Sequence, residues 1–349
     1  MKYYYPLSVT ALCTLVLLAI APAKAEVSKI YFGSCAKQYK PMPIFDAINK
    51  DKPDVFVFLG DNIYGDTEDM SELQAKYDML GAHKGFQQLR AQSEVVAIWD
   101  DHDFGENDAG KEYPQKEASR KIMLDFWQEP SDSKRYTQPG IYTSYWFGEG
   151  ENQIHLILPD LRWNRDKLHE VGKFSYITSR IPKNMGPYKV SPNAGASMLG
   201  EEQWQWLEAE LKKPAKLKII GSSLQLLPEF TGWESWANFP EDRNRLLQLI
   251  EKEQIPGVLM ISGDTHWGEM SKLNAGSYPL WEVTSSGLSE KWKDVSPNKH
   301  RVGDYTHDVN YGFIEVDWKK DDPSVSFGLK NVVGEVTHHQ QLSLSALSF

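Results

Sequence analysis

Three short clusters in this chain place carboxylates beside histidine or tyrosine at spacings that suit metal binding. They are Gly60-Asp61-Asn62-Ile63-Tyr64, Trp99-Asp100-Asp101-His102-Asp103 and Gly263-Asp264-Thr265-His266. A carboxylate is a hard ligand whose two oxygens can bridge two cations. Imidazole binds transition metals and also exchanges protons near neutral pH. Together the clusters predict a centre that holds metal ions beside an acid–base group.

In the first two clusters the residue types suggest separate tasks. Asp61 can bridge two cations, and Tyr64 can reach the same site as a phenolate. Asp101 is expected to bind metal and His102 to act as a general acid, with Asp103 orienting its imidazole. A solvated loop histidine is an equally simple interpretation of His102 taken alone.

In the third cluster Asp264 and His266 lie two residues apart on an extended stretch, so both side chains can face one side. Aspartate and glycine also follow strands in ordinary turns, so a single cluster is weak evidence. The argument therefore depends on whether the fold brings the clusters together.

The elements that must position these residues are short apolar runs, each ending in a polar cluster. The runs span 29–33, 55–59, 95–99, 154–158, 217–220 and 258–261. Such runs are typical of strands buried on both faces. Helical patterns lie between them at 43–50, 72–80, 115–128, 200–212 and 240–252. This alternation predicts an α/β fold.

In α/β folds, ligands bind outside the carboxyl ends of the strands. The six expected strand ends can deliver a common set of polar residues to one cleft. The set is Cys35, Asp61, Asp101, His102, Arg162, Asp264 and His266. Turn formation explains any one cluster, but it does not explain why cysteine, histidine and several acids gather at these ends.

The N-terminus has the pattern of a signal peptide. Lys2 precedes an apolar run at 7–20, and Ala23-Lys24-Ala25 is a small-x-small cleavage site. We expect residues 1–25 to be removed after Ala25, which implies a periplasmic or secreted protein without a stable membrane anchor. Cys13 leaves with this segment, so Cys35 remains alone and cannot form an intramolecular disulfide.

The composition indicates a folded and acidic protein. Hydrophobic residues make up 41% and charged residues 25% of the 349 residues, which excludes a disordered chain. The net charge is −10, and it becomes −12 without Lys2 and Lys24. No basic patch suits sequence-specific nucleic-acid binding. An acidic protein that handles an anionic substrate needs local positive charge, which bound metal can provide. The sequence leaves the oligomeric state open.

The order of the motifs resembles the alkaline phosphatase D family of the calcineurin-like metallophosphoesterase superfamily. The matching motifs are Gly-Ser-Cys at 33–35, Gly-Asp-x-x-Tyr at 60–64, Trp-Asp-Asp-His-Asp at 99–103, Asp-x-Arg at 160–162 and Gly-Asp-x-His at 263–266. Further similar stretches lie at 107–110, 235–245 and 284–287. The resemblance extends from about Phe32 to about Trp318.

The resemblance implies a four-layer sandwich, with two mixed β-sheets flanked by helices, formed by residues 26–349 as a single catalytic domain. It also implies a ferric ion (Fe3+) with calcium (Ca2+). By similarity, the iron ligands are Cys35 and Tyr64, Asp61 bridges the metals, and Asp101, Asp264 and His266 complete the site. Thiolate and phenolate suit iron, whereas carboxylates suit calcium.

The implied reaction is hydrolysis of a small-molecule phosphoester. Hydroxide held between two metals attacks phosphorus in line, and His102 protonates the leaving alkoxide. Arg162 is expected to grip the non-bridging oxygens, while Arg165 is expected at the surface. Four residues are possible outer contributors: Asp66, Asn107, Ser223 and Asn310.

The chain departs from the wider superfamily in three respects. Ser34-Cys35 stands where many members have Asp-x-His, and Asp101 stands where many have asparagine before the catalytic histidine. An extra N-terminal β domain of larger members is expected to be absent. Residues 167–198 are expected to form a long loop insertion that, with Trp233 and Trp236, restricts the pocket or binds an acyl or nucleoside group.

Several alternatives remain open at this point. The family includes phosphomonoesterases, phosphodiesterases and enzymes acting on phospholipids. A cysteine-nucleophile hydrolase would use Cys35 with His102 or His266, would resist chelators and would be inactivated by thiol alkylation. A secreted calcium-binding protein without catalytic activity would leave the histidines without a task.

Overall fold

The computed structural model describes Met1 and residues 27–349 of the chain. The predicted cleavage after Ala25 lies outside the described residues. None of the helices in residues 27–349 combines the length and apolar character that crossing a membrane requires.

One sheet has the strand order β15-β14-β13-β1-β2-β3. Its strands are β1 (Lys29–Gly33), β2 (Val55–Leu59), β3 (Glu94–Ile98), β13 (Asn310–Asp317), β14 (Ser324–Asn331) and β15 (Val336–Ser343). β1, β2 and β3 run parallel, and β13 pairs antiparallel with β1. All five residues of β2 are buried, as its apolar run predicts. The parallel part of the sheet brings three strand ends to one edge.

The second sheet has the order β12-β10-β11-β9-β8-β5-β4. Its strands are β4 (Thr143–Phe147), β5 (Ile154–Leu158), β8 (Leu217–Gly221), β9 (Val258–Ser262), β10 (Gly268–Leu273), β11 (Leu280–Ser285) and β12 (Arg301–Thr306). β5, β8 and β9 are parallel neighbours, while β4 and β10 run antiparallel to their partners. The six predicted strands thus form two parallel groups, one in each sheet.

The two sheets pack face to face. Trp281 of β11 and Phe327 of β14 form an edge contact across the sheets, with ring centroids 5.5 Å apart. Leu288, which follows β11, packs beside Gly33 at the end of β1. Face-to-face packing of this kind buries the inner faces of both sheets.

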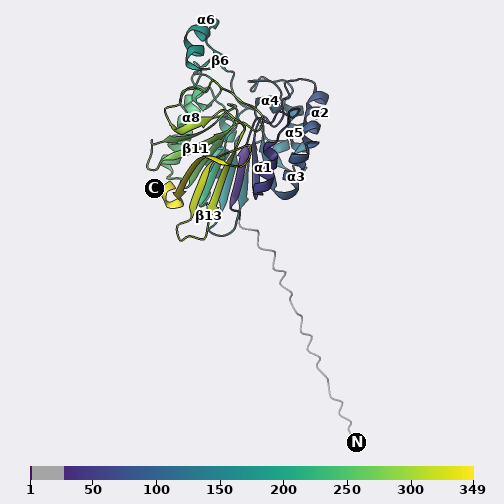
Figure 1. Ribbon diagram of the computed structural model, residues 1–349, viewed down its shortest axis with the longest axis vertical. Coiled ribbons are helices and arrows are strands. Elements are labelled where there is room, and N and C mark those ends of the chain that lie inside the picture. Colours follow the sequence, from purple (N-terminus) through teal and green to yellow (C-terminus); the bar gives the residue numbers. More distant parts are fainter. Residues whose placement is uncertain (2–26) are drawn as a thin grey trace.

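Helices cover the outer faces (Figure 1). The longer ones are α1 (Ile44–Asp51), α2 (Met70–Gly81), α3 (Lys84–Gln92), α5 (Lys116–Phe126), α7 (Gly200–Leu211) and α8 (Pro240–Lys252). Helices α1, α2, α3 and α5 lie on one side of the two sheets, and α8 lies on the other. α8 begins with Pro240 and has Glu241 and Asp242 in its first turn, where proline and acids favour a helix start. The expected four-layer sandwich is confirmed.

Residues 167–190 form a projecting segment, which we call the arm. It contains β6 (His169–Glu170), α6 (Lys173–Ser175), the π-helical turn η2 (Tyr176–Arg180), η3 (Ile181–Lys183) and β7 (Tyr188–Lys189). β6 pairs with β7 at its base, and α6 stands clear of the body (Figure 1). Residues 167–198 were expected to form a long loop. That prediction was wrong for residues 173–183, where α6, η2 and η3 follow one another without a break.

Candidate metal centre

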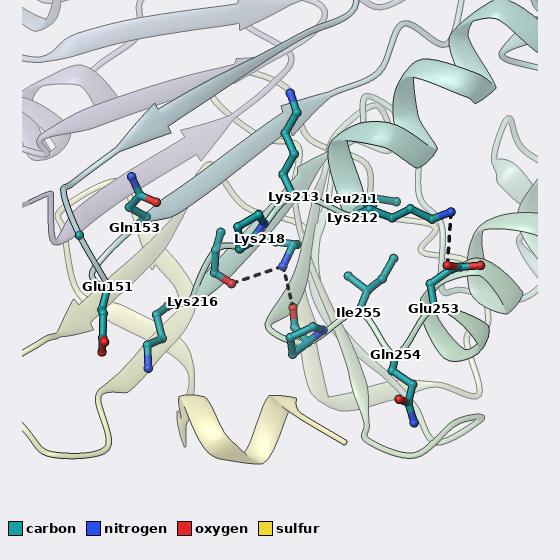
Figure 2. Close-up of a pocket in the computed structure, with 14 residues that line it drawn as sticks. Glu151, Gln153, Leu211, Lys212, Lys213, Lys216, Lys218, Glu253, Gln254 and Ile255 are labelled. Carbon is teal, nitrogen blue, oxygen red and sulfur yellow. Dashed lines mark hydrogen bonds and ion pairs between the residues drawn. The ribbon is translucent and has the colours of Figure 1, made fainter.

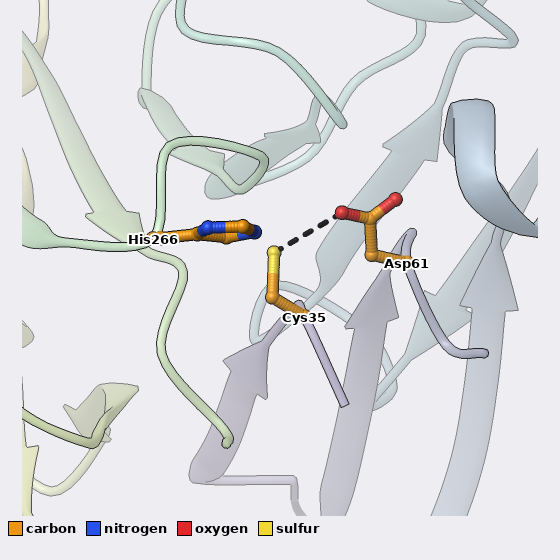
Figure 3. A group of neighbouring side chains, drawn as sticks. All are labelled: Cys35, Asp61 and His266. Carbon is orange, nitrogen blue, oxygen red and sulfur yellow. Dashed lines mark hydrogen bonds between the residues drawn. The ribbon is translucent and has the colours of Figure 1, made fainter. Parts of the chain in front are cut away.

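The loops after β1, β2 and β9 bring the first group of ligands together. Cys35, Asp61 and His266 each offer a ligand atom, and these atoms lie within 4.8 Å of one another. Cys35 Sγ lies 3.3 Å from Asp61 Oδ2 (Figure 3). The three side chains point toward a common centre from separate segments of the chain. This convergence is the one that the strand-end pattern predicts.

Three further groups extend the site, again with ligand atoms within 4.8 Å. They are Asp61, Asp101 and His102; Asp100, Asp101 and Asp264; and Asp101, Asp108 and Glu234. Asp61 belongs to two of the four groups, and Asp101 belongs to three. The arrangement therefore has room for two neighbouring cations with a carboxylate between them.

The backbone at these ligands adopts a conformation that residues other than glycine rarely take. Left-handed φ angles occur at Cys35 (63°), Asp61 (49°), Asp264 (70°) and His266 (62°). Each such residue costs about 1–3 kcal/mol and persists only where the surrounding structure imposes it, and such residues cluster at functional sites. The fold therefore retains side chains where glycine would relieve strain.

The residues fit bound cations by their chemistry. Asp61 Oδ1 is buried without a hydrogen-bond partner in the described part of the chain. Burial, and then the charge of Asp101, raise the pKa of Asp61 well above its usual range. Burial and the charge of Asp100 do the same to the pKa of Asp264. Buried carboxylates this close need a compensating positive charge, which a metal ion supplies.

The nitrogen and sulfur ligands are suited to the same role. Burial lowers the pKa of His266 to about 4, so its imidazole is neutral at neutral pH and free to ligate. Burial, and then Asp61, raise the pKa of the Cys35 thiol, so a cation beside it is needed for the thiolate to form. Ser286 supports both residues, because its Oγ lies 3.1 Å from Cys35 Sγ and accepts the His266 amide at 2.8 Å. Tyr64 completes this side, with its hydroxyl 2.9 Å from His266 Nε2.

His102 is held at the rim of the site by Asp66. The distance from His102 Nδ1 to Asp66 Oδ1 is 2.7 Å, and the imidazole lies against the Tyr64 ring with centroids 4.1 Å apart. Burial works against protonation, but Asp101 and Asp66 prevail and raise the pKa of His102 to about 9. Because Nδ1 is engaged, Nε2 is the nitrogen available for proton transfer.

The expectation that Asp103 orients His102 was wrong. Asp103 is buried and accepts the backbone amides of Asp100 at 2.6 Å and of Asp61 at 3.2 Å. It therefore shapes the loops that present the ligands. Asp66 takes the orienting position, and no local spacing marks it, because it lies 36 residues before His102.

The two arginines lie behind the ligands. Arg162 Nε donates to Asp100 Oδ1 at 2.6 Å, and its Nη1 donates to Glu234 Oε2 at 2.6 Å. Arg165 is fully buried, with Nη2 3.1 Å from Glu234 Oε1, so its expected surface position was wrong. Neither arginine lines the cavity of the site. The expected grip of Arg162 on phosphate is therefore corrected to a positioning role: it neutralises and holds Asp100 and Glu234.

A cavity of about 220 Å³ opens above the ligands. Its lining is Asp61, Asp101, His102, Asn107, Asp108, Trp233, Glu234, Asp264, Thr265, His266, Trp267 and Trp292. Trp233 and Trp292 meet edge to face at 5.7 Å in its wall. Trp236, also expected here, is a core residue whose indole donates to Ser222 at 3.0 Å. Sequence patterns did not identify Glu234 or Trp292, since neither lies in one of the motifs that follow the strands. Glu234 nevertheless joins Asp101 and Asp108 in a group whose carboxylate oxygens lie within 4.8 Å of one another.

The four possible outer contributors differ in position. Asp66 pairs with His102, and Asn107 lines the cavity. Ser223 donates to Asp100 Oδ1 at 2.6 Å, which places it in the shell behind the ligands. Asn310 accepts a hydrogen bond from Ser285 Oγ at 3.0 Å and does not line the cavity.

A larger hollow of about 560 Å³ lies at the opposite edge of the second sheet (Figure 2). The hollow lies near the amino ends of β5, β8 and β9. Its lining includes four lysines: Lys212, Lys213, Lys216 and Lys218. Lys212 is paired with Glu253 at 3.3 Å, and Lys218 donates to the carbonyls of Ala215 and Pro256. This hollow contains none of the ligand groups, so its size does not make it the reactive site.

Comparisons with known proteins agree with this geometry. The model of the PhoD-like phosphatase family matches residues 30–320. Alkaline phosphatase D of Bacillus subtilis (strain 168) is 24% identical over 303 residues, covering 74% of this chain and 48% of that protein. The chain thus spans about half the length of the curated relative that it matches.

Solved structures share the fold. The structure of PhoD has a TM-score of 0.66 at 16% identity and covers 92% of this chain and 69% of that chain. A dimetal phosphatase from Danio rerio has a TM-score of 0.53 at 14% identity, over 92% of this chain and all of the other. The resemblance expected from the motifs is confirmed: the chain belongs to the PhoD-like phosphatase family.

Proposed function

We propose that this chain is a metal-dependent phosphoester hydrolase of the alkaline phosphatase type. The observation that supports it most directly is the convergence of Cys35, Asp61, Asp101, Asp264 and His266 on one buried centre below an open cavity. Family membership supports the same conclusion. A secreted calcium-binding protein without activity would need neither the buried thiol nor the paired histidine.

The donor set suits iron and calcium on different sides. Cys35, Tyr64 and His266 provide sulfur, phenol and imidazole, which favour a ferric ion. Asp101 and Asp264 provide hard oxygens, which favour calcium, and Asp61 lies between the two sides. Metal ions bound there would activate water and neutralise charge on the phosphoryl group.

The protein's own residues supply the proton and hold the ligands. His102 keeps Nε2 available to protonate the leaving oxygen, while Asp66 engages Nδ1. Asp101 is fixed by two amides: His102 N donates to Oδ1 at 2.9 Å, and Asp108 N donates to Oδ2 at 2.7 Å. The guanidinium of Arg162 compensates the negative charge of the adjoining Asp100. Each contact preserves a geometry that the reaction needs before substrate arrives.

The size of the cavity favours a small monoester. Its volume of about 220 Å³ lies below the roughly 300–1,000 Å³ of pockets that enclose drug-sized ligands. Trp233 and Trp292 narrow it further. Diesters and phospholipids remain the second candidates, because an open mouth lets a second substituent extend into solvent.

The deciding experiment is release of p-nitrophenol from its phosphate monoester at alkaline pH, with calcium and then with chelator. Turnover that chelator abolishes and metal restores is expected. The bis-p-nitrophenyl diester, assayed in parallel, compares the two substrate classes. Folded, metal-loaded protein without turnover on the monoester would refute the phosphatase assignment.

A cysteine-nucleophile mechanism has little support in the geometry. Cys35 is fully buried, and burial raises rather than lowers its pKa. Thiol alkylation of the native protein is expected to leave turnover intact. Inactivation by alkylation with retained metal would favour the cysteine mechanism instead.

Export to the periplasm or medium remains part of the proposal. N-terminal sequencing of the protein recovered from a periplasmic fraction should begin at Glu26.

A single domain over 26–349 predicts one cooperative unfolding transition.

A further inference from the structure

The arm presents apolar side chains to solvent. Phe174, Ile177 and Ile181 are 82%, 52% and 50% exposed. They recur along α6, η2 and η3, three helical segments without a break, at spacings of three and four residues. All three side chains are thus presented to solvent within the one stretch 174–181, and we call them the apolar stripe of the arm. Large apolar side chains exposed together in one segment mark an interaction surface.

The arm also has a charge opposite to that of the rest of the protein. Its basic residues are Lys167, Lys173, Arg180, Lys183 and Lys189, and Glu170 is its one acid. The arm is therefore +4, which leaves −14 on the remainder of a chain whose net charge is −10. Within the described residues none of these five cations forms an ion pair, whereas Lys111, Lys121 and Lys212 on the body do. Unpaired cations beside an apolar stripe favour an anionic partner with an apolar interior.

The base of the arm is tied to the candidate metal centre. The Tyr188 hydroxyl donates to Asp108, whose amide donates to Asp101. Backbone bonds from Gly186 to Thr231 and from Tyr188 to Gly232 place the arm beside the Trp233 wall of the cavity. The arm projects from this end of the molecule (Figure 1). A surface bound by the arm would lie next to the mouth of the site.

We propose that the arm docks the protein reversibly on an anionic phospholipid bilayer. An apolar stripe flanked by lysines is the arrangement by which interfacial helices lie at a membrane surface. Basic residues add attraction to anionic headgroups. An acidic protein partner would use the cations but would not need three exposed apolar side chains. The inference goes beyond the proposed catalytic function, since docking requires no turnover.

The test is co-sedimentation of the protein with vesicles at low salt. One vesicle contains phosphatidylcholine alone, and the other contains equal amounts of phosphatidylcholine and phosphatidylglycerol. Binding to the anionic vesicle is expected to be about a hundredfold tighter or more, since each basic residue near the surface contributes about 1 kcal/mol, and to weaken with salt. Joint substitution Phe174→Ser, Ile177→Ser and Ile181→Ser should weaken it about a hundredfold.

Two further variants separate the contribution of the basic residues to vesicle binding from that of the apolar side chains. Lys173→Gln with Lys183→Gln should weaken binding to anionic vesicles about 30-fold. The matched control, Val333→Ser with Val336→Ser, changes two comparably exposed apolar residues on the β14–β15 hairpin and should bind as the parent does. All these residues are exposed, so the fold tolerates the changes.

Three outcomes would overturn the proposal. They are no binding to either vesicle, equal binding by the parent and the triple variant, and competition by polyglutamate that leaves the vesicles unbound. Assay of p-nitrophenyl phosphate turnover on the same samples keeps a failure of docking distinct from a failure of catalysis.

Discussion

The substitution Asp66→Asn is the most informative perturbation of the proposed mechanism. Asp66 Oδ1 lies 2.7 Å from His102 Nδ1 and is the second group that raises the pKa of His102 to about 9, after Asp101. The amide removes this charge, and its NH2 group can also stabilise the wrong tautomer. Because Asp101 remains, the pKa of His102 should fall without returning fully to its usual value.

The size of the effect follows from what His102 does. A general acid contributes about 10²–10⁴-fold to a rate, and a group that orients a catalytic or ligating imidazole about 10–100-fold. We therefore expect kcat to fall about 10–100-fold at alkaline pH. Since only protonated His102 can donate, the alkaline limb of the pH–rate profile should move to lower pH.

Comparing turnover of two substrates with different leaving groups makes the assay specific for proton donation by His102. p-Nitrophenolate departs with little protonation, whereas an alkoxide requires a proton. Asp66→Asn and His102→Ala should therefore impair an alkyl phosphate more than p-nitrophenyl phosphate. Glu68→Gln removes an exposed charge two residues away and is the matched control. Equal losses on both substrates, or an unshifted pH profile, would refute the assignment of His102 as the acid.

Three further predictions concern the ligands and their support. Arg162→Met leaves Asp100 without its cation and Glu234 with Arg165 alone, and it should lower the free energy of unfolding by about 3–5 kcal/mol, measured by urea denaturation; an unchanged midpoint would contradict the positioning role. Burial raises the pKa of Asp100 to about 7 and that of Asp103 to about 8, from 3.8, so the metal-free protein should lose stability as pH rises from about 4 to about 8. Added metal should reverse that loss, and thermal melts with and without chelator at several pH values check it. Cys35→Ser should weaken and shift any visible absorption and reduce bound iron by more than half, measured by absorbance and elemental analysis, while calcium content changes little.

Local patterns in the sequence determined most of the central framework. Continuous apolar runs identified β1, β2, β3, β5, β8 and β9 because strands buried on both faces need apolar residues throughout. Since parallel strands end at a common edge, the polar clusters after them could be expected to meet. Cys35, Asp61, Asp101, Asp264 and His266 indeed lie together.

Elements with weaker periodicity were not predicted. α3 contains glutamine, arginine and lysine with only Phe86 and Leu89 buried, so its apolar face is too narrow to mark a helix. β13 joins the first sheet by pairing with β1, and no local pattern specifies a partner some 280 residues away along the chain. The helical character of the arm was hidden by Pro182 and by its polar residues.

The tertiary structure alone decided how the side chains around the ligands are used. Asp66, not the adjacent Asp103, reaches His102, because the β2 loop folds over the short helix α4 (Asp101–Phe104). Arg162 and Arg165 turn inward because Glu234, about 70 residues later, is buried beside them. Sequence spacing records which groups can do chemistry, whereas charge compensation and orientation depend on contacts between distant segments that form only when the two sheets pack.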